Sequence, residues 1–262
     1  THKKKCLSCV RSMNCELQKL ALEYNAEEDK FGTDHDLKPI DDMSASVVRD
    51  NSKCIMCTRC VAACEHQTIG AIGPKNRGYA KVIGSPYDVS LAFTPCVNCG
   101  QCVVACPVGA LYEKSAVADV WGAIVDPDKK VVFYTAPSVR ATLGEAFSLP
   151  VGTNVEGKMV TAIKQLGDVS CFNMDITADL TIMEEANELL ARLKDGKPTP
   201  MFTSCCPGWV KFLEHYYPQY IPNLSTCKSP QEMFSALLKT YYCEKNNIEP
   251  ENLYVVSVIP CT

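Results

Sequence analysis

The chain has 262 residues, of which 47% are hydrophobic, so it is long enough for two modest domains with a real core. The formal net charge of −4 argues against nucleic acid as a partner, because such binding depends on clustered Lys and Arg. The sequence has no run of about twenty apolar residues and no secretory signal. We therefore predict no membrane span and a soluble, cytoplasmic protein.

Seventeen cysteines indicate the class of protein, and eleven of them lie at metal-ligand spacings within the first 106 residues. Secreted scaffolds held by disulfides are usually short and rich in loops, whereas this chain carries long helical and strand patterns. Disulfides remain the alternative interpretation. Oxygen-sensitive metal chemistry is the better one.

Residues 1–46 contain a small set of candidate metal ligands. One histidine and three cysteines stand in the order His2, Cys6, Cys9 and Cys15. Such a set could hold a zinc ion or a 4Fe–4S cubane, and the spacing alone leaves both open. A helix is predicted after it, because Leu17, Leu20 and Tyr24 share one face. An acidic linker over residues 34–46 follows.

Residues 47–118 contain an internal repeat of two cysteine runs, forty-two positions apart, each with the spacing C-x2-C-x2-C-x3-C. In proteins with two cubanes, the fourth cysteine of each such run binds the other cluster. We therefore assign one cluster to Cys54, Cys57, Cys60 and Cys106. We assign the second to Cys96, Cys99, Cys102 and Cys64. The repeat resembles that of bacterial ferredoxins, which implies a small ferredoxin-like domain that conducts electrons, with both clusters of the 4Fe–4S type.

From about residue 119 the pattern becomes α/β, with helices and strands in alternation. Strands are predicted over residues 131–135, 201–203 and 254–259. Helices are predicted after Pro137, around residues 159–166, and from a capping box at Ser229 to about Tyr242. Two of the strands end at cysteines, and open α/β sheets place functional residues at strand ends.

Two further features could carry chemistry. Cys205 and Cys206 are adjacent, and neighbouring side chains diverge, so we expect one to bind a metal while the other does different work. Glu185, Glu188 and Arg192 fall on one face of a predicted helix, where carboxylates could hand protons along. A solvated acidic face is the alternative for these three residues.

The segment from Thr203 to Trp209, Thr-Ser-Cys-Cys-Pro-Gly-Trp, resembles the first signature of the FeFe (iron-only) hydrogenases. Residues 259–262, Ile-Pro-Cys-Thr, resemble the opening of the second signature. With the cluster motifs, the resemblance extends over essentially the whole chain. It implies an α+β multidomain protein, in which a ferredoxin-like two-cluster domain precedes the first part of an α/β H-cluster domain at 119–262. We expect the natural polypeptide to continue beyond Thr262, and an upstream two-iron domain is common in this family.

The resemblance also implies the cofactors. The N-terminal histidine and cysteines would hold a third 4Fe–4S cluster, as in hydrogenases and the large cluster-bearing subunit of respiratory NADH dehydrogenase. The active centre would be an H-cluster, a cubane joined to a diiron unit that carries CO, cyanide and a bridging dithiolate. Cys206 and Cys261 would be two ligands of its cubane, and Cys205 would be the proton shuttle.

Further site residues are implied only by the resemblance. The proton path would run through Arg192, Glu188, Ser225, Glu185 and Cys205. The loop of Ala136, Pro137 and Ser138 would wrap the diiron unit, and Gln231 would approach its ligands. Ile259 stands where the family usually has methionine. By contrast, Cys171, Cys227 and Cys243 lack ligand spacing, so we expect them to be buried core residues.

The expected function is the reversible reduction of protons to dihydrogen, with electrons from ferredoxin or from a flavoprotein or NAD-linked partner subunit. One alternative is a sensory or non-catalytic relative in which the same clusters serve signalling or electron transfer. Another is the hydrogenase subunit of an NAD-linked, electron-bifurcating complex.

Overall fold

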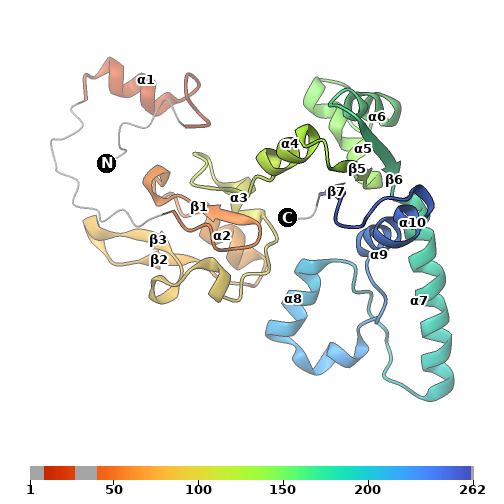
Figure 1. Ribbon diagram of the computed structural model, residues 1–262. Coiled ribbons are helices and arrows are strands. Elements are labelled where there is room, and N and C mark those ends of the chain that lie inside the picture. Colours follow the sequence, from red (N-terminus) through yellow and green to blue (C-terminus); the bar gives the residue numbers. More distant parts are fainter. Residues whose placement is uncertain (1–8, 27–39, 261–262) are drawn as a thin grey trace. The chain divides into compact units, whose positions relative to one another are not determined.

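The computed structural model describes residues 9–26 and 40–260, and it divides between Lys114 and Ser115 into two compact units (Figure 1). No helix within these ranges combines the length and the hydropathy that a membrane span requires. His2, Cys6 and Cys261, three of the predicted ligands, lie outside the described residues.

The first unit consists of short elements joined by turns. Its helices are α1 (Glu16–Glu23), α2 (Arg59–His66) and α3 (Gln101–Ala105), with single 3-10 turns at Asn51–Lys53, Gly78–Ala80, Pro86–Asp88 and Leu91–Phe93. Its strands are β1 (Val47–Arg49), β2 (Gly73–Lys75), β3 (Val82–Gly84) and β4 (Leu111–Glu113). They pair as two antiparallel ladders, β1 with β4 and β2 with β3. The ladder of β1 and β4 brings the two ends of the cysteine repeat together.

The core of the first unit is small and is packed against cysteines. Its buried members are Val47, Cys60, Val61, Ile72, Ile83, Leu91 and Leu111. The partly buried residues around it include Cys54, Cys64, Cys96, Cys102 and Cys106. Candidate metal ligands therefore occupy positions that aliphatic side chains fill in an ordinary domain of this size.

The second unit is built on a parallel sheet in the order β6–β5–β7. The strands are β5 (Lys130–Thr135), β6 (Val169–Asn173) and β7 (Leu253–Val258). The helices are α4 (Val117–Val125), α5 (Pro137–Thr142), α6 (Glu156–Lys164), α7 (Asp175–Asp195), α8 (Pro207–Tyr216), α9 (Pro230–Leu237) and α10 (Cys243–Asn246). Irregular helical turns span Leu143–Phe147, Pro218–Asn223 and, as a π-helix, Leu238–Tyr242. The long α7 packs against α9 (Figure 1).

The central strand β5 is buried on both faces, as expected for a parallel sheet covered by helices. Val132 and Tyr134 pack with Phe234 of α9 and with Leu238. Val131 and the next alternate residue, Phe133, pack on the opposite side with α4 and α6. Because side chains alternate along a strand, one apolar run fills two separate cores.

Most of the predicted elements are present, with small shifts at their ends. The predicted strand over 131–135 is β5, and the strand predicted over 254–259 is β7, which ends at Val258. Ser229 caps α9 by accepting the backbone N–H of Glu232 at 3.2 Å. The helix predicted to stop near Tyr242 continues through a π turn and α10 to Asn246.

One strand prediction is wrong. Residues 201–203 make no strand in the described chain; Phe202 makes a single parallel bridge to Leu224. Phe202 donates its N–H to the Asn223 carbonyl at 2.8 Å and accepts from the Ser225 N–H at 2.7 Å. The apolar pattern of three residues cannot show whether a neighbouring strand lies alongside, and here only one residue pairs.

The cap of α9 can be tested by substitution. Ser229→Ala removes the oxygen that accepts the Glu232 N–H, and we expect it to lower the free energy of unfolding by about 1 kcal/mol. Ser229→Asp keeps an acceptor and should stay close to the wild type. Urea unfolding followed by circular dichroism measures both variants, and equal losses in the two would contradict a capping role.

Candidate functional site

The two cysteine runs share a backbone conformation as well as a sequence pattern. In the first run the residues on either side of the second cysteine are left-handed, with φ of 56° at Met56 and 63° at Thr58. In the second run the equivalent residues, forty-two positions later, have φ of 56° at Asn98 and 72° at Gly100. Non-glycine residues seldom adopt this region, so the matched strain indicates that each run needs the same tight loop.

Each run then enters a helix, α2 or α3, and these two helices pack together. Beyond the helices, backbone N–H groups point at the fourth cysteine of each run. Ala71 donates to Cys64 Sγ at 3.3 Å, and Ala110 donates to Cys106 Sγ at 3.2 Å. Hydrogen bonds to sulfur are among the factors that tune iron–sulfur clusters. The repeat therefore extends to the groups around the thiols.

The eight cysteines line two hollows in the first unit. One hollow has Cys54, Cys57, Cys60 and Cys106 in its wall. The other has Cys64, Cys96, Cys99 and Cys102. Each therefore takes three thiols from one run and the fourth from the other, which is the grouping that the spacing predicts. Within the described residues, no three His, Cys, Asp or Glu side chains are placed to hold a single metal ion.

The electrostatics of these thiols fit a cluster. Burial, with further repulsion from Cys54 and Cys106, raises the pKa of Cys60 to about 11. Burial, with repulsion from Cys96 and Cys99, raises the pKa of Cys102 to about 12. Four thiolates around one hollow would repel one another, and the irons of a cubane would supply the compensating positive charge. The donor sets therefore suit two 4Fe–4S clusters.

Of the two N-terminal cysteines that the structure describes, Cys9 lies near the first hollow. Cys9 Sγ is 4.0 Å from the carbonyl oxygen of Val108, which lines the hollow of Cys106. Cys15 precedes α1 as its N-cap residue. The other two members of this predicted set, His2 and Cys6, are outside the described residues, so the ligand set stays a prediction.

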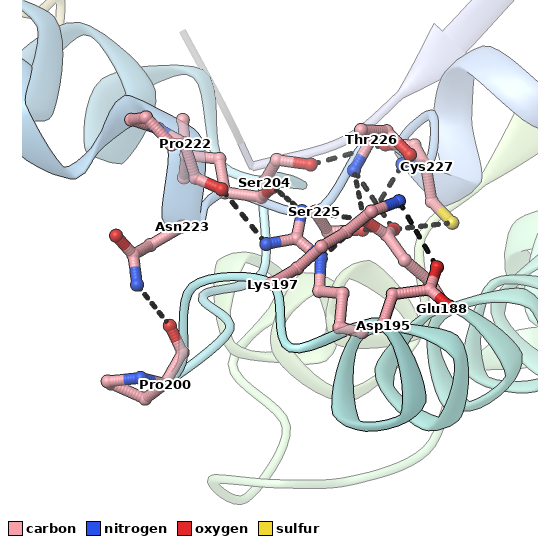
Figure 2. Close-up of polar contacts among 12 residues, drawn as sticks. Glu188, Asp195, Lys197, Pro200, Ser204, Pro222, Asn223, Ser225, Thr226 and Cys227 are labelled. Carbon is pink, nitrogen blue, oxygen red and sulfur yellow. Dashed lines mark hydrogen bonds and ion pairs between the residues drawn. The ribbon is translucent and has the colours of Figure 1, made fainter.

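In the second unit, Glu188 of α7 lies at the centre of a hydrogen-bonded network (Figure 2). Its Oε1 accepts two bonds from Arg192, at 2.9 and 2.7 Å, one helical turn away. Its Oε2 accepts the Ser225 hydroxyl at 2.9 Å. The backbone N–H of Thr226 donates to both oxygens, at 3.2 and 3.0 Å. Three of the five predicted path residues are thus joined directly.

Arg192 also fixes the loop that follows the 3-10 turn at residues 218–223. Its guanidinium donates to the carbonyls of Pro222 at 2.9 Å and Leu224 at 2.5 Å. The side chain is only 6% exposed, and that of Glu188 is 16% exposed. A buried guanidinium keeps its charge, so this pair ties α7 to the segment that carries Ser225.

The network lowers the pKa of Glu188. Burial alone would raise that pKa, but the hydrogen bonds from Arg192, Ser225 and the Thr226 N–H outweigh it. Because the folded pKa lies below its ordinary value, ionised Glu188 stabilises the fold at neutral pH. That contribution is lost only as the pH falls through the lowered pKa.

Cys205 and Glu185, the remaining members of the predicted path, have fewer polar contacts than Glu188, Arg192 and Ser225. Cys205 and Cys206 are exposed, just before α8, and Cys206 Sγ accepts the Trp209 N–H at 3.5 Å. The side chains of Cys205 and Glu185 make no hydrogen bond within the described part of the chain. The next residue back, Ser204, donates its hydroxyl to the Cys227 carbonyl at 3.2 Å, so the cysteine pair is tied to the Ser225 loop.

Cys227 is a site residue that the sequence analysis missed. It is half-buried and belongs to none of the three hydrophobic clusters, whereas Cys243 is buried in the core as expected and Cys171 packs at the edge of another cluster. Its Sγ lies 3.6 Å from Glu188 Oε2, and its N–H donates to Ser225 Oγ at 3.1 Å. Its nearness in sequence to Ser225 was the only available signal.

The loops after β5 and β7 meet at one edge of the sheet, because the two strands are parallel neighbours. Ala136 is buried and donates its N–H to the Val258 carbonyl at 3.0 Å, directly before Ile259. Pro137 opens α5, which also contains the exposed Ser138. Ligand sites in open α/β folds commonly occupy this edge.

Gln231 belongs to the same neighbourhood. Its Nε2 donates to Ser257 Oγ at 3.3 Å, near the end of β7. Its backbone carbonyl accepts the Tyr134 hydroxyl at 3.2 Å, near the end of β5. Gln231 is therefore held at the edge where Ala136 and Ile259 lie.

Three parts of the chain match family models. Residues 129–262 match the iron only hydrogenase large subunit, C-terminal domain. Residues 53–110 match a 4Fe-4S dicluster domain, and residues 1–30 match the iron-sulfur binding region of NADH-ubiquinone oxidoreductase-G.

The chain is 47% identical to the NADP-reducing hydrogenase subunit HndD of Solidesulfovibrio fructosivorans, over 99% of this chain and 46% of the relative. It is 44% identical to iron hydrogenase 1 of Clostridium pasteurianum, over 100% of this chain and 46% of the relative. A more distant relative is the cytosolic Fe-S cluster assembly factor NAR1 of Candida dubliniensis, 31% identical over 68% of this chain and 30% of the relative. The chain spans about half the length of the two hydrogenases.

Among solved structures, apo FeFe-hydrogenase HydA1 from Chlamydomonas reinhardtii matches with a TM-score of 0.54 and 41% identity. The match covers 57% of this chain and 39% of that one. The two proteins are therefore similar in sequence as well as in fold.

The exchange of the fourth cysteines can be tested by metal content. Cys106→Ser should lower bound iron by about four atoms per chain. Adding Cys57→Ser should cause no further loss, because both cysteines line one hollow, whereas adding Cys99→Ser should bring the loss to about eight atoms. The matched control is Cys171→Ser, because Cys171 lies outside both hollows. Iron and sulfide analysis of anaerobically purified protein measures the losses, and the opposite result for the two double variants would contradict the exchange.

The Glu188–Arg192 pair can be tested by stability. Arg192→Met leaves the Glu188 carboxylate half-buried without its cation, and we expect the free energy of unfolding to fall by about 3 kcal/mol. Lys194→Met removes an exposed cation two residues along the same helix and should change it by less than about 0.5 kcal/mol. Urea unfolding at neutral pH compares the two, and equal small effects would show that the pair does not anchor α7.

Proposed function

Because this chain belongs to the family of iron-only hydrogenases, we propose that it forms the cluster relay and the first half of the active site of an FeFe hydrogenase. The reaction would be the reversible combination of two protons and two electrons into dihydrogen. The observation that carries the proposal is the hydrogen-bonded series of Arg192, Glu188 and Ser225, tied by Ser204 to the cysteine pair. A protein that served only as an electron carrier would have no need of a proton path.

The clusters, when bound, supply electron transfer and the site where protons are reduced. In the first unit, the two hollows with four cysteines each would hold the relay. Cys9 lies beside the hollow of Cys106, which favours entry of electrons at the N-terminal set. In the second unit, Cys206 and Cys261 would bind the cubane of the active centre.

Ser225 is suited to passing a proton rather than keeping one. Its hydroxyl donates to Glu188 Oε2, while its oxygen accepts the Cys227 N–H. To pass a proton on, the oxygen would take one up at its second lone pair as the hydroxyl releases its own to the carboxylate, whereas the Cys227 N–H only orients the hydroxyl. Arg192 keeps Glu188 ionised and ready to accept, which suits the outer end of the path.

Glu185 and Cys205 would complete the path towards the active centre. Glu185 precedes Glu188 by three residues on α7, so both point from the same face of the helix. Cys205 is free of any hydrogen bond in the described chain and could carry a proton on its thiol. The loop of Ala136, Pro137 and Ser138, with Gln231 and Ile259, would surround the diiron unit at the edge of the sheet.

One similarity favours a particular class of electron-transfer partner. The relative named as an NADP-reducing hydrogenase subunit is 47% identical over nearly all of this chain. This similarity favours a nicotinamide-linked partner subunit over free ferredoxin. The presence of such a subunit in material purified from the native source would support it.

The hydrogenase proposal predicts hydrogen evolution from reduced viologen by the complete polypeptide, measured anaerobically after the diiron cofactor is loaded. Cys205→Ser, Glu185→Gln and Glu188→Gln should each lower the rate about a hundredfold or more, because each removes a proton carrier. Glu184→Gln is the matched control, an exposed carboxylate on the same helix, and should leave the rate unchanged.

An inactive protein with a fully loaded active centre would contradict the proposal. It would favour the non-catalytic alternative, to which the similarity to the NAR1 assembly factor already gives some support. The first reversion to make in that case is Ile259→Met.

A further inference from the structure

A buried arginine lies against one of the two cysteine-lined hollows. Arg49 is the last residue of β1, is 7% exposed, and forms part of the wall of the hollow of Cys54, Cys57, Cys60 and Cys106. Charged side chains are seldom buried to this degree without a specific partner. The partners of Arg49 therefore determine how strongly its positive charge acts on groups in the hollow.

The partners of Arg49 compensate its charge only in part. Nη1 donates to the hydroxyl of Ser85, a fully buried neutral group, at 3.1 Å. Nη2 lies 3.6 Å from Asp41 Oδ2, which is longer than a charge-assisted hydrogen bond. The Asp41 carboxylate is also bound elsewhere, since it accepts the Ser90 hydroxyl at 2.5 Å and the Leu91 N–H at 2.9 Å.

The guanidinium is electrostatically coupled to the cysteines of this hollow. Burial lowers the pKa of Arg49, whereas the nearby Asp41, Cys54 and Cys60 raise it. Arginine stays protonated in proteins even when buried. Arg49 therefore places a permanent positive charge beside Cys54 and Cys60.

Within the part of the chain that the structure describes, no charged side chain lines the second hollow. Its wall consists of Val47, Cys64, Ile69, Cys96, Val97, Cys99, Gly100, Gln101 and Cys102. Forty-two residues after Arg49, at the repeat distance, the sequence has Leu91, which is buried in the core. The two halves of the repeat thus differ in charge at one equivalent position.

We propose that Arg49 raises the reduction potential of the cluster held by Cys54, Cys57, Cys60 and Cys106 above the value it would otherwise have, so that the two cubanes are not equivalent. Reduction adds one negative charge to a cluster, and a cation nearby in a medium of low dielectric stabilises that charge. The inference depends on the proposed function, because it takes both sets of cysteines to be cluster ligands. Arg49 would thereby shift the electron towards the first hollow.

The test is an anaerobic redox titration of the purified chain with its clusters, followed by electron paramagnetic resonance. In Arg49→Gln we expect reduction of one cubane to become about tenfold less favourable, which is 59 mV for one electron, while the other stays unchanged. Arg49→Lys retains the charge and should keep most of the wild-type potential. In a Cys106→Ser background, which lacks the first cluster, Arg49→Gln should move nothing.

A second variant covers the case in which Arg49→Gln does not fold. Asp41→Asn preserves the shape of the carboxylate but removes the opposing charge, so it should raise the potential of the same cubane. Unchanged potentials in both Arg49→Gln and Asp41→Asn would overturn the inference and leave Arg49 a structural tie between β1 and Ser85. Failure of the proposed relay is distinguishable, because wild-type protein would then lack cubane iron and sulfide altogether.

Discussion

The first unit depends on gathering cysteines around two hollows in groups of four. Five of these cysteines pack directly against the few buried core residues of the unit. A sixth, Cys60, is itself a buried member of that core. A unit with such short strands buries little apolar surface, and small domains of this kind commonly take their stability from metal. Repulsion between the thiols disfavours this arrangement until a metal compensates it. The proposed clusters would therefore contribute to the core of the first unit as well as conduct electrons.

The second unit brings together loops from distant parts of the chain. Its parallel sheet collects the ends of β5 and β7 at one edge, where Ala136, Gln231 and Ile259 lie. The buried pair of Glu188 and Arg192 does the same for α7 and the segment of Ser225 to Cys227. A charge pair at low exposure, in which every guanidinium nitrogen donates a hydrogen bond, holds one geometry, which a proton path requires.

The repeat in the first unit is close to symmetric in its backbone but not in its charges. The left-handed turns and the N–H groups aimed at sulfur recur in both halves. The charge of Arg49 does not recur, since its counterpart in the sequence is Leu91. Such a difference can make an electron reside on one cluster more than on the other, because two identical clusters would share it equally.

Much of this protein could be predicted from local pattern. Cysteine spacing alone predicted which thiols surround each hollow, because loops of two residues allow few arrangements of sulfur. The face of α7 that carries Glu188 and Arg192 followed from helical periodicity, and the strand β5 from its apolar run. Contacts between distant segments could not be predicted in this way. The strand predicted at residues 201–203 is a single bridge, Cys227 lies beside Glu188 rather than in the core, and Arg49 faces a hollow. Each of these outcomes depends on which remote backbone or side chain lies alongside, and that information exists only once the chain has folded.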